Sequence, residues 1–136
     1  MSHTPRQAAG ADDTRPRLLI ADDDPVVRAT LSSELTEFRI VALAKDATEA
    51  IELAERHRPD LALVDVDMPG GGGREAVRRI SRSSPRTSLV ILSVDETRSD
   101  VVELLNAGAV AYLRKGSTAA ELTLALREAL RVKDGA

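Results

Sequence analysis

Five short apolar runs, each separated from the next by a longer segment with helical spacing, most constrain the fold of this chain. Runs of this length are typical of buried strands. Because a helical segment follows each run, the strands are expected to lie parallel in one sheet with helices on both faces. The sequence therefore predicts an α/β fold of five βα units. The expected strands are residues 17–21, 40–44, 61–65, 88–93 and 109–113.

The intervening segments carry helix signals. Apolar side chains recur at three- and four-residue steps after Pro25 and again near the C-terminus, where Leu124 lies off the stripe and is expected to be exposed. Asp46 followed by Glu49 resembles a capping box, and Gly108 is typical of a helix end. The two stripes consist of Val27, Leu31, Leu35 and Phe38, and of Leu122, Ala125, Leu126, Ala129 and Leu130.

Length and charge indicate one small soluble domain. The chain has 136 residues, which suits a single core. Its net charge of -3 gives no electrostatic reason to expect direct nucleic-acid binding. The first residues lack the apolar stretch of a signal peptide, and no run approaches the ~20 apolar residues of a membrane span. We therefore expect a cytoplasmic protein that does not contact the membrane.

Composition also suggests where the domain begins and ends. Residues 1–16 contain Pro, Gly and scattered charges without periodicity, so they are expected to form a flexible tail. The domain is expected over residues 17–133, with residues 134–136 as its C-terminal end. The sequence has no Cys, which excludes a disulfide framework.

Carboxylates follow two of the expected strands. Asp65 closes the third apolar run, and Asp22, Asp23 and Asp24 follow the first. Asp24 is the weakest candidate of its triplet and, next to Pro25, is expected to be a helix N-cap. Ligands of open α/β sheets bind at the carboxyl ends of the strands. Two carboxylates about 4 Å apart repel by roughly 4 kcal/mol at an effective dielectric constant near 20, so such a cluster favours a cation. The ligand atoms are all oxygen, which suits Mg²⁺ better than zinc.

Four motifs at successive strand ends resemble the receiver domain of bacterial two-component response regulators. They are the Asp22-Asp23 pair, the D-x-D-M-P turn at 65–69, Ser93 at the end of the fourth strand and Lys115 after the fifth. The resemblance covers about residues 17–132. Residues 108–116 and the following Glu-Leu pair are most similar to the subfamily that usually carries a LuxR-type helix-turn-helix DNA-binding domain.

The resemblance implies the flavodoxin-like strand order 2-1-3-4-5 and a role for each motif. Asp65 would be the phosphoryl acceptor. Asp23 and Asp65 would bind Mg²⁺ directly, Asp22 would bind it through water, and Asp67 would contribute its backbone carbonyl. Two side chains would then bind phosphoryl oxygens, Lys115 through its charge and Ser93 through its hydroxyl.

The resemblance also implies a switch and a set of partners. Movement of Ser93 toward the phosphoryl group would vacate space that Tyr112 fills. The surface of the fourth helix, fifth strand and fifth helix, roughly residues 97–130, would then change its affinity for an output protein or a DNA-binding domain outside this chain. The phosphoryl group would come from a sensor histidine kinase or a phosphotransfer protein. A homodimer is also compatible, and no catalysis beyond self-phosphorylation and self-dephosphorylation is expected.

Two other functions remain open. The segment Asp65-Val66-Asp67 also fits the D-x-D of haloacid-dehalogenase-type phosphatases, in which the first Asp is the nucleophile and the second the acid. There the motif follows the first strand and the acidic pair comes late, whereas this chain has the reverse order and no room for a cap domain. The third possibility is a receiver fold that binds proteins without being phosphorylated. Ser93, Lys115 and the complete acidic set argue against it.

Two residues depart from the family pattern. Val94 stands where Ala or Gly is typical, and its methyl groups are expected to narrow the entrance to the phosphorylation site and slow phosphorylation by small donors. Gly116 replaces a common proline; since a cis bond before a non-proline residue costs about 3–4 kcal/mol, the Lys115 loop is expected to be either trans or looser there.

The run of four glycines at 70–73 does not fit a phosphate-binding loop. The pattern G-x-x-x-x-G-K-[ST] is absent from the sequence. The run is therefore expected to be a flexible turn that leads into the third helix.

Overall fold

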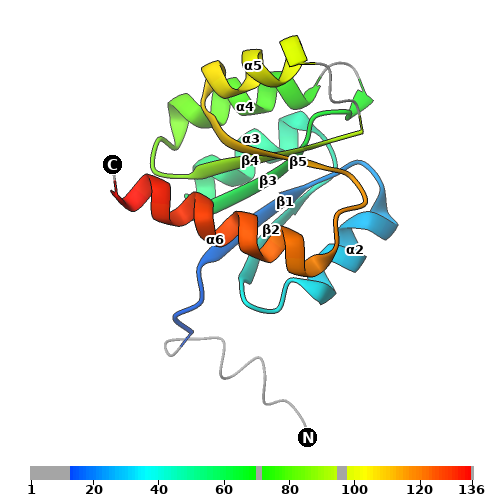
Figure 1. The fold of residues 1–136 in the computed structure, drawn as a ribbon, viewed down its shortest axis with the longest axis vertical. Helices are drawn as coiled ribbons and strands as arrows, with labels where there is room; N and C mark the ends of the chain where they lie inside the picture. Colours follow the sequence, from blue (N-terminus) through cyan, green and yellow to red (C-terminus); the bar gives the residue numbers. More distant parts are fainter. Residues whose placement is uncertain (1–12, 70–71, 95–97, 136) are drawn as a thin grey trace, which may run out of the picture.

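The protein forms one five-stranded sheet covered by helices on both faces (Figure 1). A computed structural model describes residues 13–69, 72–94 and 98–135. Strands and helices alternate along this part of the chain. In order they are β1 (Arg17–Ala21), α2 (Pro25–Glu34), β2 (Arg39–Ala44), α3 (Ala47–His57), β3 (Leu61–Asp65), α4 (Gly72–Ser83), β4 (Ser88–Ser93), α5 (Arg98–Ala107), β5 (Ala109–Arg114) and α6 (Ala119–Gly135).

The strand order confirms the predicted topology. The sheet runs β2-β1-β3-β4-β5, and every neighbouring pair is parallel. Each expected strand lies within one residue of its observed bounds, β2 beginning at Arg39 and β5 ending at Arg114. All carboxyl ends therefore meet at one edge of the sheet, with β1 and β3 side by side at its centre.

Two apolar cores lie on opposite faces of the sheet because side chains alternate along each strand. Leu19 and Val64 face the core covered by α3, α4 and α5, whereas Leu18 and Leu63 face the core covered by α2 and α6. All four side chains are fully buried. Burial of each aliphatic side chain contributes about 1.5–3 kcal/mol. The two cores therefore fix the position of each strand, and with it which residues lie at the strand ends.

The helix beginnings follow the predicted chemistry. Asp24 is the N-cap of α2 and accepts a hydrogen bond from the Val26 amide at 2.8 Å, with Pro25 in the first turn. The Asp46 carboxylate accepts from the Glu49 amide at 2.8 Å at the start of α3. Leu124 on α6 is 70% exposed, as expected for a residue off the buried stripe.

One predicted helix is shorter than its stripe. Leu35 is the C-cap of α2, and Phe38 lies in the turn before β2, although both side chains are buried. The Phe38 amide donates to the Leu35 carbonyl at 3.2 Å. The turn thus places Phe38 in the same core that a continued helix would reach, which is why apolar spacing alone did not reveal the helix end.

The glycine run is not simply a flexible turn, because Gly72 and Gly73 are the first residues of α4. A Cβ on Gly73 would lie 2.2 Å from Val66 Cα and 2.8 Å from the Asp65 carbonyl oxygen. Only glycine allows the first turn of α4 to pack directly against the end of β3. Residues 70 and 71 lie outside the described residues, as do residues 1–12 of the expected tail.

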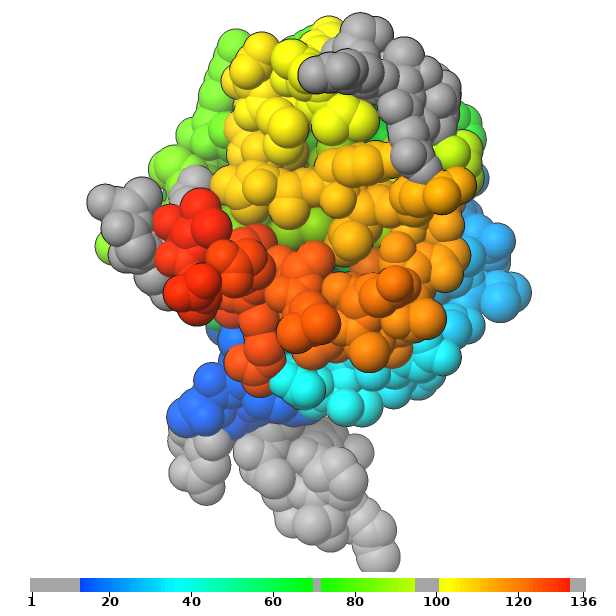
Figure 2. All heavy atoms as spheres, viewed as in Figure 1, coloured from blue at the N-terminus to red at the C-terminus, as the bar shows by residue number. Residues whose placement is uncertain are grey.

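The elements α5, β5 and α6 form one continuous face of the molecule (Figure 2). Four large apolar side chains on these helices are substantially exposed: Val102, Leu105, Leu124 and Val132. Within the described part of the chain, no helix combines the length and apolar character needed to cross a membrane.

Candidate functional site

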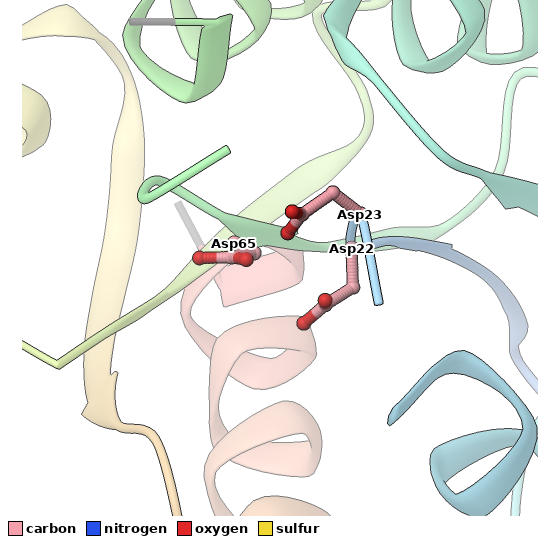
Figure 3. Close-up of side chains that lie close together, drawn as sticks. All are labelled: Asp22, Asp23 and Asp65. Atoms are coloured by element: carbon pink, nitrogen blue, oxygen red, sulfur yellow. The ribbon is translucent and has the colours of Figure 1, made fainter. Parts of the chain in front are cut away.

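Three carboxylates converge at the carboxyl edge of the sheet. Asp22 and Asp23 directly follow β1, and Asp65 is the last residue of the adjacent β3. One oxygen from each lies within 4.8 Å of the others, and the side chains point into a common space (Figure 3). Asp22 and Asp65 are fully buried, whereas Asp23 is exposed to solvent. The arrangement brings together the three acidic residues that sequence analysis grouped.

Local hydrogen bonds orient the two buried carboxylates. Asp22 Oδ1 accepts from the Asp24 amide at 2.9 Å, and Asp65 Oδ1 accepts from the Asp67 amide at 2.8 Å. In each case the bond spans two residues, an Asx turn that holds the carboxylate at the strand end. Each Asp uses one oxygen for its own loop and directs the other toward the shared space.

Lys115 supplies the positive charge opposite these oxygens. Its Nζ lies 2.8 Å from Asp65 Oδ2 and 3.5 Å from Asp22 Oδ2. The Lys115 amide donates to the Ser93 carbonyl at 3.0 Å, which ties the loop after β5 to the end of β4. Lys115 therefore reaches the carboxylates from a loop that the sheet itself positions.

The charges shift two pKa values in the same direction for different reasons. Burial raises the pKa of Asp65, and its neighbour Asp22 adds to the shift, although Lys115 and the Asp67 amide oppose it. Burial would lower the pKa of Lys115, but its hydrogen bond to Asp65 and the charges of Asp65 and Asp22 outweigh burial, so the pKa of Lys115 is raised. The raised pKa keeps the Lys115 ammonium charged. The charged form of Asp65 is disfavoured by burial and is stabilised in part by Lys115 and the Asp67 amide.

The donor set fits a hard divalent cation. Asp22 Oδ2 is buried and, in the described part of the molecule, has no hydrogen-bond donor; Lys115 at 3.5 Å is its ion-pair partner. The three carboxylates carry three negative charges against the one positive charge of Lys115. Carboxylate oxygens at this spacing are ligands that Mg²⁺ accepts, usually with several waters retained. A cation bound there would satisfy Asp22 Oδ2 and reduce the carboxylate repulsion.

The two predicted switch residues, Ser93 and Tyr112, lie on the neighbouring strands β4 and β5. Ser93 is 5% exposed and lines a hollow of about 150 Å³ together with Val66 and Asp67. Tyr112 is partly buried against the core that contains Ile91, its neighbour across the β4–β5 pair. Both predicted switch residues therefore lie on neighbouring strands, Ser93 at the carboxyl edge and Tyr112 farther back along β5.

The structure adds contacts that sequence reasoning missed. The Asp67 carboxylate is not one of the three clustered carboxylates. Its Oδ2 accepts a hydrogen bond from the Val94 amide at 2.8 Å, which links the loop after β3 to the loop after β4. Arg28 donates to the Asp22 carbonyl at 2.7 Å from α2. Thr118 and Glu121 form a reciprocal capping box at the start of α6, a pattern legible in the sequence as T-x-x-E.

The two departures from the family pattern have distinct structural outcomes. The Lys115–Gly116 bond is trans, and Gly116 has a φ of +94°, a conformation that favours glycine. The Val94 side chain is 64% exposed at the rim of the site. Its effect on access to Asp65 stays a prediction.

Comparison with known proteins agrees with this geometry. Residues 18–127 match the family described as response regulator receiver domain. The chain is 37% identical over 114 residues to response regulator GacA of Pseudomonas viridiflava, covering 82% of this chain and 53% of GacA. It is 39% identical over 116 residues to the transcriptional regulatory protein PdtaR of Mycobacterium tuberculosis, covering 84% and 56%. The chain thus spans about half the length of the curated relatives it matches.

Solved structures show the same fold. A LuxR-family two-component response regulator from Aurantimonas sp. superposes with a TM-score of 0.81 at 30% identity, over 88% of this chain and 87% of that one. A CheY-like receiver from Methanospirillum hungatei superposes with a TM-score of 0.82 at 24% identity, over 90% and 98%, and supports the flavodoxin-like fold alone. By sequence and by fold, this chain belongs to the receiver domains of two-component response regulators.

Proposed function

We propose that Asp65 is phosphorylated and that the phosphoryl group switches an output surface of this domain in the cytoplasm. The observation that carries the proposal is the convergence of Asp22, Asp23 and Asp65 on one space, with the Lys115 ammonium 2.8 Å from Asp65 Oδ2. Phosphoryl transfer needs chiefly positioned charge, which this arrangement supplies. The donor is proposed to be a phosphohistidine of a sensor kinase or phosphotransfer protein.

The proposed step forms one bond and breaks another. A carboxylate oxygen of Asp65 attacks the phosphorus of the donor and forms an acyl phosphate. The bond from phosphorus to the donor nitrogen breaks, and the departing imidazole keeps the electron pair and later takes up a proton. Self-dephosphorylation is a separate second step. Water attacks the phosphorus, the bond from phosphorus to the Asp65 oxygen breaks, and inorganic phosphate and the Asp65 carboxylate are released.

Four residues have proposed roles toward a divalent cation. Asp23 and Asp65 would hold Mg²⁺ directly, Asp22 through water, and Asp67 through its backbone carbonyl. When bound, the cation would neutralise charge on the transferred phosphoryl group. The side chain of Asp67 is engaged with the Val94 amide, which is compatible with a carbonyl role.

Two side chains are proposed to bind the product. Lys115 already lies against Asp65, so the phosphoryl oxygens would replace the carboxylate as its charged partner. Ser93 would donate its hydroxyl to a second phosphoryl oxygen. Because Ser93 ends β4 and its carbonyl binds the Lys115 amide, movement of Ser93 would reach the loop after β5 and make room for Tyr112.

The output surface is proposed to be the face formed by α5, β5 and α6. Its exposed apolar side chains, including Val102 and Leu124, are candidates for a contact that phosphorylation strengthens or weakens. The similarity to a LuxR-family regulator suggests a DNA-binding domain as one partner of this face. A separate output protein and a second copy of the chain are the other two proposed partners.

The proposal is tested by intact-mass measurement after incubation with acetyl phosphate and Mg²⁺. We expect the wild-type chain to gain the mass of one phosphoryl group and Asp65→Asn to gain none. Asp24→Asn is the matched control, because it removes a neighbouring charge while asparagine preserves the helix cap. A wild-type chain that gains no mass with acetyl phosphate or with a phosphorylated histidine-containing donor would contradict the proposal and favour a binding module.

A further inference from the structure

Arg74, a residue that the family pattern does not assign, lies in the first turn of α4, which packs against the end of the strand that carries Asp65. It follows Gly73, whose position against the Asp65 carbonyl and Val66 brings the first turn of α4 to the end of β3. The Arg74 side chain lines the hollow of about 150 Å³ whose walls also include Asp67 and Ser93. The Arg74 side chain therefore borders a hollow that two residues of the candidate site, Asp67 and Ser93, also line.

Arg74 also holds a carboxylate on the neighbouring helix. Its Nη1 donates to Glu103 Oε1 on α5, and Arg78 Nη2 lies 3.5 Å from Glu103 Oε2. The Arg74 and Glu103 side chains are 38% and 47% exposed. Because Arg78 also contacts Glu103, departure of Arg74 would leave that carboxylate with a cation. Arg74 can therefore change partners without leaving the Glu103 carboxylate unpaired.

We propose that Arg74 is a second phosphoryl-binding cation, shared between Glu103 in the unphosphorylated domain and the phosphoryl group on Asp65 in the phosphorylated one. The inference rests on the proposed phosphorylation of Asp65. Arg74 would bind from the α4 and Ser93 side of the site, whereas Lys115 binds from the loop after β5. The exchange would weaken one tie between α4 and α5, a helix of the proposed output surface.

The relative strengths of the two interactions favour the exchange. Exposed ion pairs are weak because solvent screens them and two long side chains must be ordered. A phosphoryl group carries a charge of about -1.5 to -2 and three acceptor oxygens, and a guanidinium binds two such oxygens at once. A phosphoryl group on Asp65 would therefore be a stronger partner for Arg74 than Glu103 is.

The test compares rates of phosphoryl uptake from acetyl phosphate in Mg²⁺, followed by intact mass. Arg74→Gln should slow uptake by about three- to tenfold, since a charged hydrogen bond is lost and only a weak surface pair is released. Arg74→Lys should recover part of the rate. Arg79→Gln is the matched control, because Arg79 lies on the same helix and pairs with Glu75. We expect its rate to equal that of the wild type.

A double-mutant cycle separates phosphoryl binding from a structural role of Arg74. Glu103→Gln should free Arg74 and raise the uptake rate by about two- to fivefold. The same change in an Arg74→Gln background should have no effect. If wild-type protein is phosphorylated but Arg74→Gln matches Arg79→Gln, or if Glu103→Gln acts equally in both backgrounds, the role of Arg74 is overturned and the proposed function stands. Failure of wild-type protein to acquire the group would overturn both.

Discussion

The Lys115 ammonium donates a hydrogen bond of 2.8 Å to Asp65 Oδ2, and this pair forms between a loop and a strand end that lie on opposite sides of β4. The bond does not fully compensate the burial of Asp65, whose pKa remains above its ordinary value of 3.8. The site therefore holds unfavourable negative charge that a cation can relieve.

Removing the charge of Asp65 should stabilise the metal-free protein at neutral pH. A raised native pKa means that the folded state binds more protons than the unfolded state as the pH rises above 3.8, so stability falls through that window. The Asp65→Asn variant does not undergo this fall in stability, because asparagine does not ionise. We expect its free energy of unfolding in EDTA at pH 7 to exceed that of the wild type by on the order of 1 kcal/mol.

The pH dependence of that difference is the sharper measurement. Urea unfolding in EDTA gives the free energy of unfolding of both proteins at each pH. The difference between them should be constant below the ordinary pKa of Asp65. It should grow in favour of Asp65→Asn as the pH rises from there through the native pKa. An advantage that shrinks with rising pH would mean that Lys115 and the Asp67 amide outweigh burial and that the pKa of Asp65 is lowered.

Magnesium should stabilise the folded chain through the acidic cluster. A ligand that binds only the native state at 100 times its Kd contributes about 2.7 kcal/mol, and thermal unfolding should shift upward accordingly. Asp23→Asn should abolish most of the shift because Asp23 supplies an exposed oxygen to the cluster. Asp24→Asn should retain it. An equal shift in all three proteins would indicate binding elsewhere.

Gly73→Ala should destabilise the protein more than Gly72→Ala. The new Cβ at position 73 would meet the Val66 backbone at 2.2 Å, whereas at position 72 it would meet the Ala47 side chain at 2.9 Å. Overpacking against backbone typically costs about 1–3 kcal/mol. Both changes raise helix propensity equally, so the difference between their unfolding midpoints isolates the clash. Equal midpoints would show that α4 can move away from β3.

Features that depend on a few neighbouring residues were predictable from the sequence. Local patterns determined the strands, the helix caps at Asp24 and Asp46 and the exposure of Leu124, because propensity and burial act over a few residues. Parallel pairing then placed Asp22 and Asp65 at one edge. Their approach follows from topology, so the acidic cluster was predictable from the order of the strands.

Features that depend on distances between helices were not predictable. The glycine run reads as a turn, yet Gly73 is set by the approach of α4 to β3. The exposed pair between Arg74 and Glu103 requires the angle between α4 and α5, for which residue spacing gives no information. Apolar spacing did not predict that α2 ends before Phe38, because the observed turn buries the Phe38 side chain just as a further helical turn would.

Shortening the side chain at position 94 should speed phosphorylation by small donors. Val94 is 64% exposed at the rim of the site, and its amide holds Asp67, a contact that alanine preserves. We expect Val94→Ala to raise the uptake rate from acetyl phosphate by a few-fold, with transfer from a phosphohistidine protein as the comparison. An unchanged rate with acetyl phosphate would mean that Val94 does not narrow the entrance.

The most direct test locates the phosphoryl group itself. The wild-type chain is incubated with acetyl phosphate and Mg²⁺, the acyl phosphate is reduced with borohydride, and the peptides are mapped by mass spectrometry. Reduction converts a phosphorylated aspartate to homoserine, and we predict that conversion at Asp65 alone, dependent on Mg²⁺ and absent after EDTA. Conversion at another aspartate, or an unmodified Asp65 peptide in protein that has gained a phosphoryl group, would contradict the account.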